Sequence, residues 1–473
     1  MLLRAVFCHE LAQISYLIGC QATGEALVVD PNRDVEQYIE IARREGLRIT
    51  AVTETHIHAD YVSGVRELAL RLGARPYLSG AGSEEWRYRY AEETGAVCLH
   101  DGDDVMVGNI RLDVIHTPGH TPEHISLLIT DTRSADRPMG ILTGDFVFVG
   151  DVGRPDLLER AVGAAGSMQE SARQLFRSLQ RFKQVPDYVQ VWPAHGAGSA
   201  CGKALGAVMQ STVGYERLFN WALAIDDEDG FIQAVLEGQP DPPTYFAQMK
   251  QVNRDGPRLR PAAPPARLSP ALLSGDLQSI GVIVDVRSSE AYAACHIPGT
   301  LNIPWGRSFL TWAGWLLPYD RPIALIADET LVQPVQQILQ LIGIDDLAGY
   351  WAADDIASWG CSGRPYGQIE RCKAQAARPL LELDGIAVLD VRTAAEYAAG
   401  HLPGSINIPL GYLPGRLDEL PQHRPILVHC ESGLRSAIAA SILISGGCRH
   451  VIDLCDGFRA WRTLDYPIVV PSS

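Results

Sequence analysis

A cluster of metal-binding side chains lies near the start of the chain. His56, His58 and Asp60 fall within five residues, directly after an apolar, β-rich run at residues 47–52. Neutral imidazole and carboxylate groups are the usual ligands of a catalytic divalent metal. Tyr61 closes the stretch. The spacing predicts one part of a metal site at the end of a strand.

Three later segments carry the same chemistry. His120 follows an alternating run at residues 110–115 and a Pro-Gly turn, Asp145 ends an apolar strand, and His195 ends another. One such residue alone is more often structural, but the chance coincidence of four segments in the order His-x-His-x-Asp, His, Asp, His is small. We therefore predict that the four segments meet in one metal-binding cleft.

A different chemistry is predicted near the C-terminus. A buried-strand run at residues 425–429 leads into Cys430, and a helix rich in Ala and Ile follows. A thiol at the start of such a loop faces backbone N–H groups and a helix N-terminus, which lower its pKa and hold an anion. Cys430 is therefore a candidate nucleophile, and Arg435 a candidate anion contact. The other loop residues expected to face a substrate are Glu431, Ser432, Gly433 and Leu434.

The elements that must position these residues fall into three segments. Residues 1–250 alternate short apolar runs with amphipathic stretches, which is typical of an α/β domain. Residues 251–268 are rich in proline and predict an extended linker. Behind the linker the chain repeats itself with a period near 105 residues, which predicts a duplicated small domain at residues 269–366 and 367–473.

The two copies of the repeat differ at one decisive position. Each copy reads as strand, turn, helix, strand and helix, which predicts a parallel sheet covered by helices. The strand that ends in Asp285-Val286-Arg287 returns as Asp390-Val391-Arg392. An alignment of the following strands, at an offset of 103 residues, places Ala327 where the second copy has Cys430. Because Ala has no thiol, the first copy is predicted to be inactive.

Composition limits the classes of function. The chain has 473 residues, enough for about three domains, and a formal net charge of −16. This charge repels phosphate backbones and anionic membrane surfaces, so we expect no nucleic-acid and no membrane partner. The first residues hold too short an apolar run for a signal peptide, and no apolar stretch of about 20 residues follows, so we expect a cytoplasmic protein. The ten cysteines include no C-x-x-C pair, which argues against a zinc ribbon or a disulfide framework.

The histidine and aspartate segments resemble the metallo-β-lactamase superfamily over nearly all of residues 1–220. In that superfamily the first motif is His-x-His-x-Asp-His, and Tyr61 stands here in the last place. The resemblance implies an αββα sandwich. Two branches compete, since glyoxalase II-like thioester hydrolases hold two metals and persulfide dioxygenases hold a single iron(II). The tyrosine favours the second branch because it removes a ligand of the second metal.

In the persulfide dioxygenase branch, the resemblance implies one Fe(2+) per chain. The implied ligands are His56, His120 and Asp145, a face that leaves positions open for substrate sulfur and dioxygen. The residues that then become outer groups, or a weak second metal site, are His58, Asp60, Tyr61 and His195.

Two further segments of this domain are expected to contact the substrate. Arg154 and Asp156 lie in a segment that resembles the Gly-Arg-x-Asp segment of persulfide dioxygenases, where it shapes the site and binds the thiol carrier. Cys201 follows His195 and is expected near the site. Its thiol either relays a persulfide sulfur or lines the pocket.

Both copies of the repeat resemble the rhodanese family. The resemblance rests on the Asp-Val-Arg strand end, the His-x-Pro-Gly turn and the Asn-Ile-Pro exit, which both copies carry. Rhodaneses accept sulfane sulfur on the loop cysteine as a persulfide, which implies this role for Cys430. The charge of Glu431 is expected to disfavour a small dianion relative to a carrier persulfide.

The order of the domains resembles the persulfide dioxygenase–rhodanese fusions of bacterial sulfide detoxification. It implies oxidation of a low-molecular-weight thiol persulfide with O2 to sulfite and free thiol, coupled to formation or use of thiosulfate. One alternative is a thioester hydrolase that carries sulfur-handling domains, and another is a sulfur-carrier or sensing scaffold with a vestigial metal site. We expect the chain to form a homo-oligomer.

Overall fold

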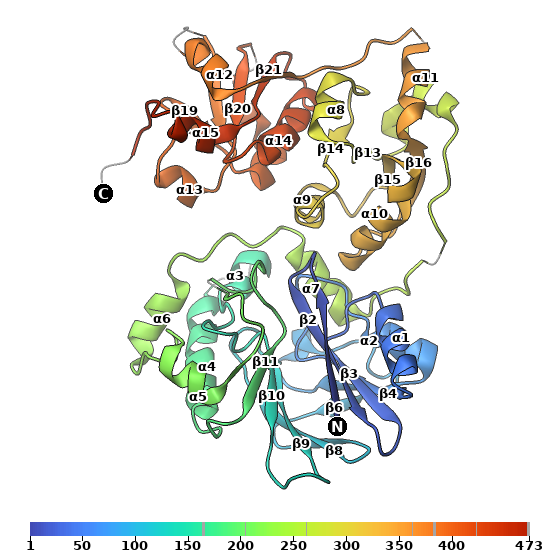
Figure 1. The fold of residues 1–473 in the computed structure, drawn as a ribbon, viewed down its shortest axis with the longest axis vertical. Helices are drawn as coiled ribbons and strands as arrows, with labels where there is room; N and C mark the ends of the chain where they lie inside the picture. Colours follow the sequence, from blue (N-terminus) through green and yellow to red (C-terminus); the bar gives the residue numbers. More distant parts are fainter. Residues whose placement is uncertain are drawn as a thin grey trace. The chain divides into compact units, whose positions relative to one another are not determined.

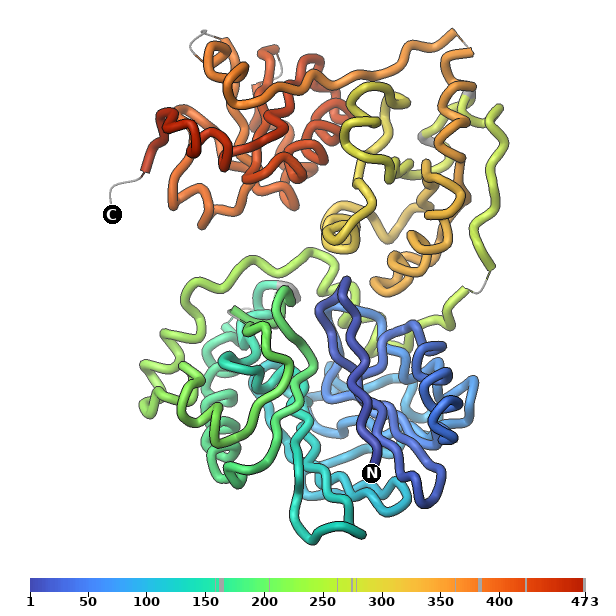
Figure 2. Tube along the Cα trace, in the orientation of Figure 1, coloured from blue at the N-terminus to red at the C-terminus, as the bar shows by residue number. Residues whose placement is uncertain are grey.

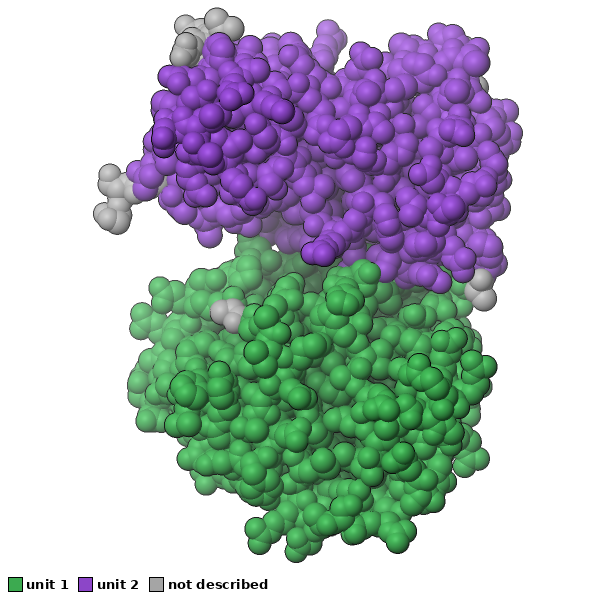
Figure 3. All heavy atoms as spheres, in the orientation of Figure 1, with its two compact units in different colours: residues 1–261, 340–343 green, residues 262–339, 344–473 purple. Residues whose placement is uncertain are grey.

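The chain forms two compact units in the computed structural model. The structure describes residues 1–162, 166–203, 205–261, 263–361, 363–381, 385–421 and 423–470. The first unit holds residues 1–261 and 340–343, and the second holds residues 262–339 and 344–473 (Figure 3). Residue 262 of the predicted linker and the last three residues of the predicted second rhodanese domain lie outside the described residues.

The first unit contains two mixed sheets. Among its described residues, each sheet has six strands, which are hydrogen-bonded in sequence order. The first sheet consists of β1 (Leu2–Cys8), β2 (Gln13–Cys20), β3 (Glu25–Val29), β4 (Arg48–Thr53), β5 (Arg75–Ser79) and β6 (Val97–Leu99). The second consists of β7 (Asp104–Val107), β8 (Ile110–His116), β9 (Ile125–Asp131), β10 (Gly140–Gly144), β11 (Gln190–Pro193) and β12 (Ser211–Thr212).

Helices cover the outer faces of both sheets. Helices α1 (Glu36–Arg44) and α2 (Val65–Leu72) lie beside the first sheet, and α4 (Ser167–Phe182) and α6 (Glu228–Leu236) lie on the side of the second (Figure 1). The other helices of this unit are α3 (Leu157–Val162), α5 (Val213–Phe219) and α7 (Phe246–Asp255).

Three apolar cores hold these layers together. One joins α1 and α2 to the first sheet through residues such as Tyr38 and Leu68. A second lies between the sheets, where Ile14 belongs to the same cluster as Leu127. A third joins the second sheet to α4 and α6 through residues such as Leu175. Alternate burial along the strands and one apolar stripe on each helix produce this arrangement, and it confirms the predicted αββα sandwich.

The second unit contains two parallel sheets, one for each copy of the repeat. In the described residues, the first has the order β14 (Leu301–Asn302), β13 (Val282–Asp285), β15 (Ile323–Ala327) and β16 (Leu347–Ala352). The second has the order β17 (Glu370–Cys372), β21 (Val451–Leu454), β20 (Ile426–His429), β18 (Ala387–Asp390) and β19 (Ser405–Asn407). All these pairings are parallel, as predicted.

Helices connect the strands of both copies. The first copy has α8 (Ser289–Ala294), α9 (Phe309–Leu316), α10 (Glu329–Leu341) and α11 (Ile356–Cys361). The second has α12 (Ala374–Leu381), α13 (Ala394–Ala398), α14 (Leu434–Ser445) and α15 (Gly457–Thr463). No helix among the described residues is long and apolar enough to cross a bilayer.

The predicted linker begins later than the proline content indicates. Helix α7 continues to Asp255, so the first five residues of the predicted segment 251–268 are helical. The helix stops at Gly256, which has a positive φ of 102° and directly precedes a proline. From there the described residues up to 268 form no helix, and the tube in Figure 2 is extended.

Candidate functional site

Loops that follow three different strands bring the predicted metal ligands together. His56 follows β4 in the chain, His120 follows β8 and Asp145 follows β10. One ligand atom from each lies within 4.8 Å of the other two. Asp145 Oδ2 is 3.8 Å from His56 Nε2 and 3.6 Å from His120 Nε2. All three side chains are buried.

The hydrogen bonds of these side chains leave the converging atoms free. His120 Nδ1 lies 3.2 Å from the carbonyl oxygen of Arg154 and can only donate to it, which leaves Nε2 as the lone-pair nitrogen. His56 Nδ1 lies 3.0 Å from the hydroxyl of Thr55. Asp145 Oδ2 is buried and has no hydrogen-bond partner. Two imidazole nitrogens and an unpartnered carboxylate oxygen at these spacings fit a divalent metal ion.

The protonation states agree with this fit. Burial lowers the pKa of His56 well below its usual value, and the nearby His58 adds to the effect. Burial also lowers the pKa of His120, against the opposing charge of Asp145. Burial would raise the pKa of Asp145, but His195, His56 and His120 hold it well below its usual range. At neutral pH the site therefore offers two neutral imidazoles and a carboxylate, the forms that bind metal.

Asp30 supports the first motif and was not found by the sequence analysis. Its carboxylate accepts hydrogen bonds from the Thr55 amide at 2.6 Å and from the Thr55 hydroxyl at 3.1 Å. The hydroxyl oxygen of Thr55 can therefore accept from His56 Nδ1, which fixes the tautomer of the ligand. Asp30 has a positive φ of 51°, which is uncommon for a non-glycine residue. Nothing in the local sequence signals this backbone conformation.

His195 is hydrogen-bonded to two carboxylates, those of Asp145 and Asp60. Its Nδ1 is 2.6 Å from Asp145 Oδ1, and its Nε2 is 2.9 Å from Asp60 Oδ2. Although burial acts in the opposite direction, these two charges raise the pKa of His195 well above its usual value. Both ring nitrogens then donate hydrogen bonds. The outer role of His195 and Asp60 stays a prediction.

Cys201 lies beside Asp60 and His195. Its sulfur belongs to a group with Asp60 and His195 in which the ligand atoms lie within 4.8 Å of one another. The side chain is buried, and burial together with the charges of Asp145 and Asp60 raises the pKa of its thiol well above the usual value. The structure therefore places Cys201 beside the site as a neutral thiol.

Tyr61 is turned toward Asp30 and away from the converging metal-binding atoms. Its hydroxyl lies 3.3 Å from both the Gln13 side-chain nitrogen and the Asp30 carbonyl. Its ring stacks on His58 with 4.4 Å between the centroids. His58 Nε2 lies 3.1 Å from Asp30 Oδ1, and although burial opposes it, this contact raises the pKa of His58 to about 8. His58 and Tyr61 thus act as outer groups in this arrangement.

Arg154 and Asp156 are paired with each other inside the protein. Both are buried, and they form a two-pronged ion pair at 3.0 and 2.8 Å. The Arg154 guanidinium also donates to the carbonyls of Ala200 and Pro240 at 3.2 and 2.5 Å. All three guanidinium nitrogens therefore donate within the protein, so Arg154 supports the loops around His120 and Cys201, and a contact with the carrier stays a prediction.

His124 and Glu123 are two further supports that the sequence analysis left without a role. His124 Nε2 accepts from the Asp145 amide at 3.2 Å, and its ring stacks on His56. Glu123 accepts from the Ile57 amide at 2.8 Å. Both lie in the same histidine-rich segment as His120, which was the available signal.

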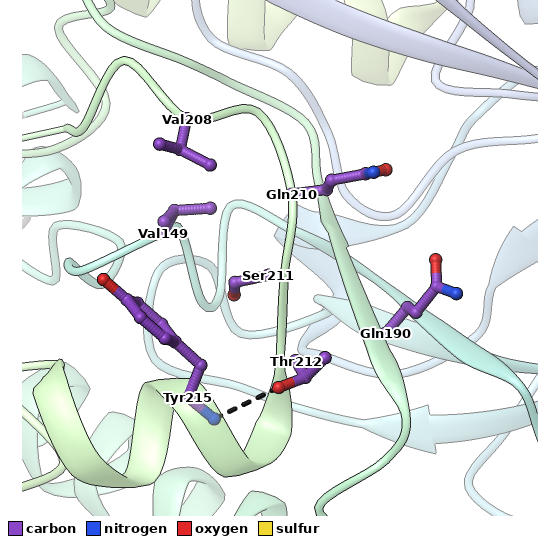
Figure 4. A pocket seen from close by; sticks show the side chains of 7 residues that line it. All are labelled: Val149, Gln190, Val208, Gln210, Ser211, Thr212 and Tyr215. Carbon is purple, nitrogen blue, oxygen red and sulfur yellow. Dashed lines mark hydrogen bonds between the residues drawn. The ribbon is translucent and has the colours of Figure 1, made fainter.

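A large cavity on the first unit lies elsewhere. It has a volume of about 520 Å³ and opens at the surface (Figure 4). Its lining residues are Val149, Gln190, Val208, Gln210, Ser211, Thr212 and Tyr215. It contains none of the metal-binding side chains and no charged group, so we locate the reaction by the converging ligand atoms.

The loop after β20 forms the second candidate site. Cys430 is buried at its start, and its sulfur accepts a hydrogen bond from the Gly433 amide at 3.1 Å. Gly433 has a φ of 96°, and a Cβ there would lie 1.9 Å from the Cys455 carbonyl oxygen, so only glycine fits. Helix α14 begins at the next residue. One backbone N–H group of the predicted cradle, that of Gly433, therefore contacts the Cys430 sulfur, and the Ser436 hydroxyl lies 3.8 Å from it.

The charged residues of this loop are paired within the protein. Arg435 forms two bonds of 2.7 Å with Glu396, and its predicted contact with an anion stays a prediction. Burial opposes it, but this pairing lowers the pKa of Glu396 to about 2. Glu431 lies 3.7 Å from Arg392 and 3.6 Å from Arg459, which offsets its charge at the rim.

The first copy has no such loop. Asp285 pairs with Ile326 in the sheet as Asp390 pairs with His429, so Ala327 occupies the position of Cys430, as predicted. After Ala327 only one residue precedes α10, which begins at Glu329. In the second copy three residues separate Cys430 from the start of α14. An early helix start has therefore replaced the cradle, in addition to the loss of the thiol.

Comparison with known proteins identifies the scaffold of both units. The Metallo-beta-lactamase superfamily profile matches residues 10–195, and the Rhodanese-like domain profile matches residues 269–349 and 373–464. The crystal structure of a metallo-beta-lactamase from Staphylococcus aureus subsp. aureus COL is 47% identical, with a TM-score of 0.70, and the match covers 74% of this chain and 99% of that one. The chain belongs to the metallo-β-lactamase superfamily.

Curated relatives of this superfamily member fall into both of the competing branches. The mitochondrial persulfide dioxygenase ETHE1 of Bos taurus is 27% identical over 48% of this chain and 78% of its own length. The hydroxyacylglutathione hydrolase of Gloeobacter violaceus is 34% identical over 38% of this chain, which spans 62% of that enzyme. The predicted combination of a metallo-β-lactamase domain with two rhodanese domains is confirmed, and the chain is related to proteins of sulfur metabolism.

Proposed function

We propose that this protein is a non-haem iron(II) persulfide dioxygenase with an attached rhodanese sulfurtransferase. The observation that carries the proposal is the convergence of one ligand atom each from His56, His120 and Asp145, where Asp145 Oδ2 has no hydrogen-bond partner. Iron(II) held by these two imidazoles and this carboxylate would supply Lewis acidity toward a persulfide sulfur and the redox chemistry with dioxygen.

The proposed reaction consumes a low-molecular-weight thiol persulfide. R-SSH, dioxygen and water give sulfite, the free thiol R-SH and protons. In this scheme His195 and Asp60 hold Asp145 in place, and Thr55 and Arg154 orient the two histidines through their Nδ1 atoms. The neutral Cys201 lines the site, since a buried thiol beside two carboxylates is a poor nucleophile.

The rhodanese step is proposed to use Cys430 as a covalent carrier. Its thiol takes the outer sulfur of a second R-SSH and releases R-SH, and the cysteine persulfide then passes that sulfur to sulfite and forms thiosulfate. The reverse sequence supplies persulfide from thiosulfate. The Gly433 amide, which contacts the sulfur, is placed to stabilise the thiolate that leaves.

The test is oxygen uptake by anaerobically iron-loaded protein with several defined persulfides, among them those of glutathione and coenzyme A. We expect one oxygen consumed for each sulfite formed. The absence of oxygen uptake with every persulfide would contradict the proposal. Cys430→Ser should abolish thiosulfate formation and spare sulfite, and the matched change Cys448→Ser, at a buried cysteine outside the loop, should spare both.

The second candidate function is a two-metal thioester hydrolase, which the hydrolase relative favours. It requires a second metal at Asp60 and His195, where hydrogen bonds now occupy both nitrogens of the histidine. Two zinc ions per chain, with thioester cleavage and no oxygen uptake, would establish it. We further propose that the protein acts in the cytoplasm in sulfide detoxification, as a homo-oligomer.

A further inference from the structure

Helix α7 contacts the metal-binding loop although it lies outside the residues that match the superfamily profile. Asn253 on this helix is fully buried. Its amide nitrogen donates to the carbonyls of His58 and Tyr61, each at 2.7 Å, and its oxygen accepts from the Ser63 amide at 2.8 Å. One side chain therefore binds three backbone groups of residues 58–63.

Neighbouring residues of the same segment extend this contact. The Tyr245 hydroxyl donates to the Asp60 carbonyl at 3.1 Å. The Lys250 ammonium lies 3.5 Å from the centroid of the Trp86 ring and interacts with the charge of Glu123, which accepts from the Ile57 amide. Tyr245 and Asn253 thus contact the loop directly, and Lys250 interacts with it through Glu123. Together these interactions reach from Ile57 to Ser63.

The loop needs such partners. Residues 54–62 form no helix and no strand, yet nearly all of them are buried, so their backbone polar groups depend on contacts outside the sheets. An amide side chain suits this position, because it has two donors for the carbonyls and one acceptor for the N–H.

Two routes lead from this loop to the metal ligands. Asp60 accepts a hydrogen bond from His195, and His195 donates a second one to Asp145 Oδ1. His58 is hydrogen-bonded to Asp30, and the Asp30 carboxylate accepts from the Thr55 hydroxyl, which lies beside His56 Nδ1. A displaced loop would therefore misplace ligands on both sides of the site.

We propose that Asn253 is a positioning residue for the metal site, through its three hydrogen bonds to the loop that carries His58 and Asp60. The inference rests on the proposed function only to the extent that a metal binds at His56, His120 and Asp145. It also makes α7 part of the metal-binding domain, which therefore extends beyond residue 195.

The test compares two isosteric changes at buried asparagines. Asn253→Asp keeps the acceptor and the shape but turns two donors into a carboxylate oxygen that faces two carbonyls. Asn302→Asp is the matched control in the first rhodanese copy, where a fully buried amide donates to the carbonyls of Asp285 and Arg287 at 2.8 and 3.0 Å. Iron(II) affinity is measured anaerobically by competition with a chromophoric chelator.

We expect Asn253→Asp to weaken iron(II) binding by about 10- to 100-fold, the usual cost of losing an outer support of a metal site. The Asn302→Asp control should bind iron like the wild type. Tyr245→Phe, which removes the hydroxyl that donates to the Asp60 carbonyl and should fold normally, is expected to weaken binding by a smaller factor. The unfolding temperature of each metal-free variant separates this effect from a general loss of stability.

Equal iron affinity in the wild type and Asn253→Asp would overturn the inference and leave the proposed function intact. An equal loss in both asparagine variants would also overturn it, because the effect would then not be local. If Asn253→Asp does not fold, unchanged affinity in Tyr245→Phe overturns it. A wild-type chain that takes up no iron would instead refute the proposed function, and the inference with it.

Discussion

Asp145 presents one carboxylate oxygen to each half of the metal site, and the two oxygens have different surroundings. Oδ2 faces the Nε2 atoms of His56 and His120 at 3.8 and 3.6 Å and has no hydrogen-bond partner. Oδ1 accepts a short hydrogen bond of 2.6 Å from His195, whose other nitrogen bonds to Asp60.

The difference teaches how a two-metal scaffold can hold one metal. A buried carboxylate oxygen without a hydrogen-bond partner is costly, and a cation bound beside Oδ2 would offset that cost. In the other half a histidine with two donors supplies the positive charge, and Tyr61 adds no ligand because its hydroxyl points to Gln13 and Asp30. Four predictions test this contrast, in order of decreasing effect.

Loss of a ligand in the unpartnered half should have the largest effect. His120→Ala removes one of the three converging atoms, and we expect iron(II) affinity to fall about a thousandfold, more than outer changes cost. The exposed His100 provides the control, and His100→Ala should bind normally. Titration with iron(II) under anaerobic conditions measures both. Tight iron binding by His120→Ala would show that the metal lies elsewhere.

Loss of the histidine in the hydrogen-bonded half should cost less. His195→Asn frees Asp145 Oδ1 and Asp60 but removes no ligand of the proposed iron. We expect affinity to fall by about 10- to 100-fold, with a maximum of one iron per chain. The same titration checks this prediction, and a loss as large as that of His120→Ala would mean that His195 is itself a ligand.

Tyr61→His should convert the hydrogen-bonded half into a weak second site. The new imidazole joins Asp60 and His195, which together can hold a metal once His195 gives up its Nε2 proton. After loading with zinc, the metal content measured by elemental analysis should rise from one to about two metals per chain. The oxygen uptake of the iron-loaded variant should fall. Tyr61→Phe should stay at one metal. A Tyr61→His chain that still holds one metal would weaken the contrast.

The smallest effect concerns pH. Burial lowers the pKa values of His56 and His120, so both stay neutral below the usual histidine value of about 6.5. Since protons compete with metal only below these lowered pKa values, iron affinity should change by less than about threefold between pH 8 and pH 6.5. Chelator competition at several pH values measures it. A tenfold or larger fall over this range would indicate exposed ligands.

Local sequence patterns predicted which candidate ligands come together, because each of them ends a strand or follows a turn. His56, His120 and Asp145 meet as expected, and the alignment that places Ala327 opposite Cys430 agrees with the sheet register. The duplicated domain was visible because both copies keep their strand ends and turns.

The supporting contacts could not be predicted in this way. Asn253 lies about 190 residues from the loop that it binds, and Asp30 acts through an uncommon backbone conformation. The sequence shows that Arg154 and Arg435 are charged, but their carboxylate partners depend on side-chain directions in the fold.

The most direct test of the single-metal site is the metal content of the wild-type chain. Protein loaded anaerobically with an excess of iron(II) is desalted and analysed for metal per chain, and the measurement is repeated with zinc. The site described here predicts one tightly bound metal in both cases. Two tightly bound metals per chain would contradict it, because Asp60 and His195 would then be ligands and not the hydrogen-bonded half of the site.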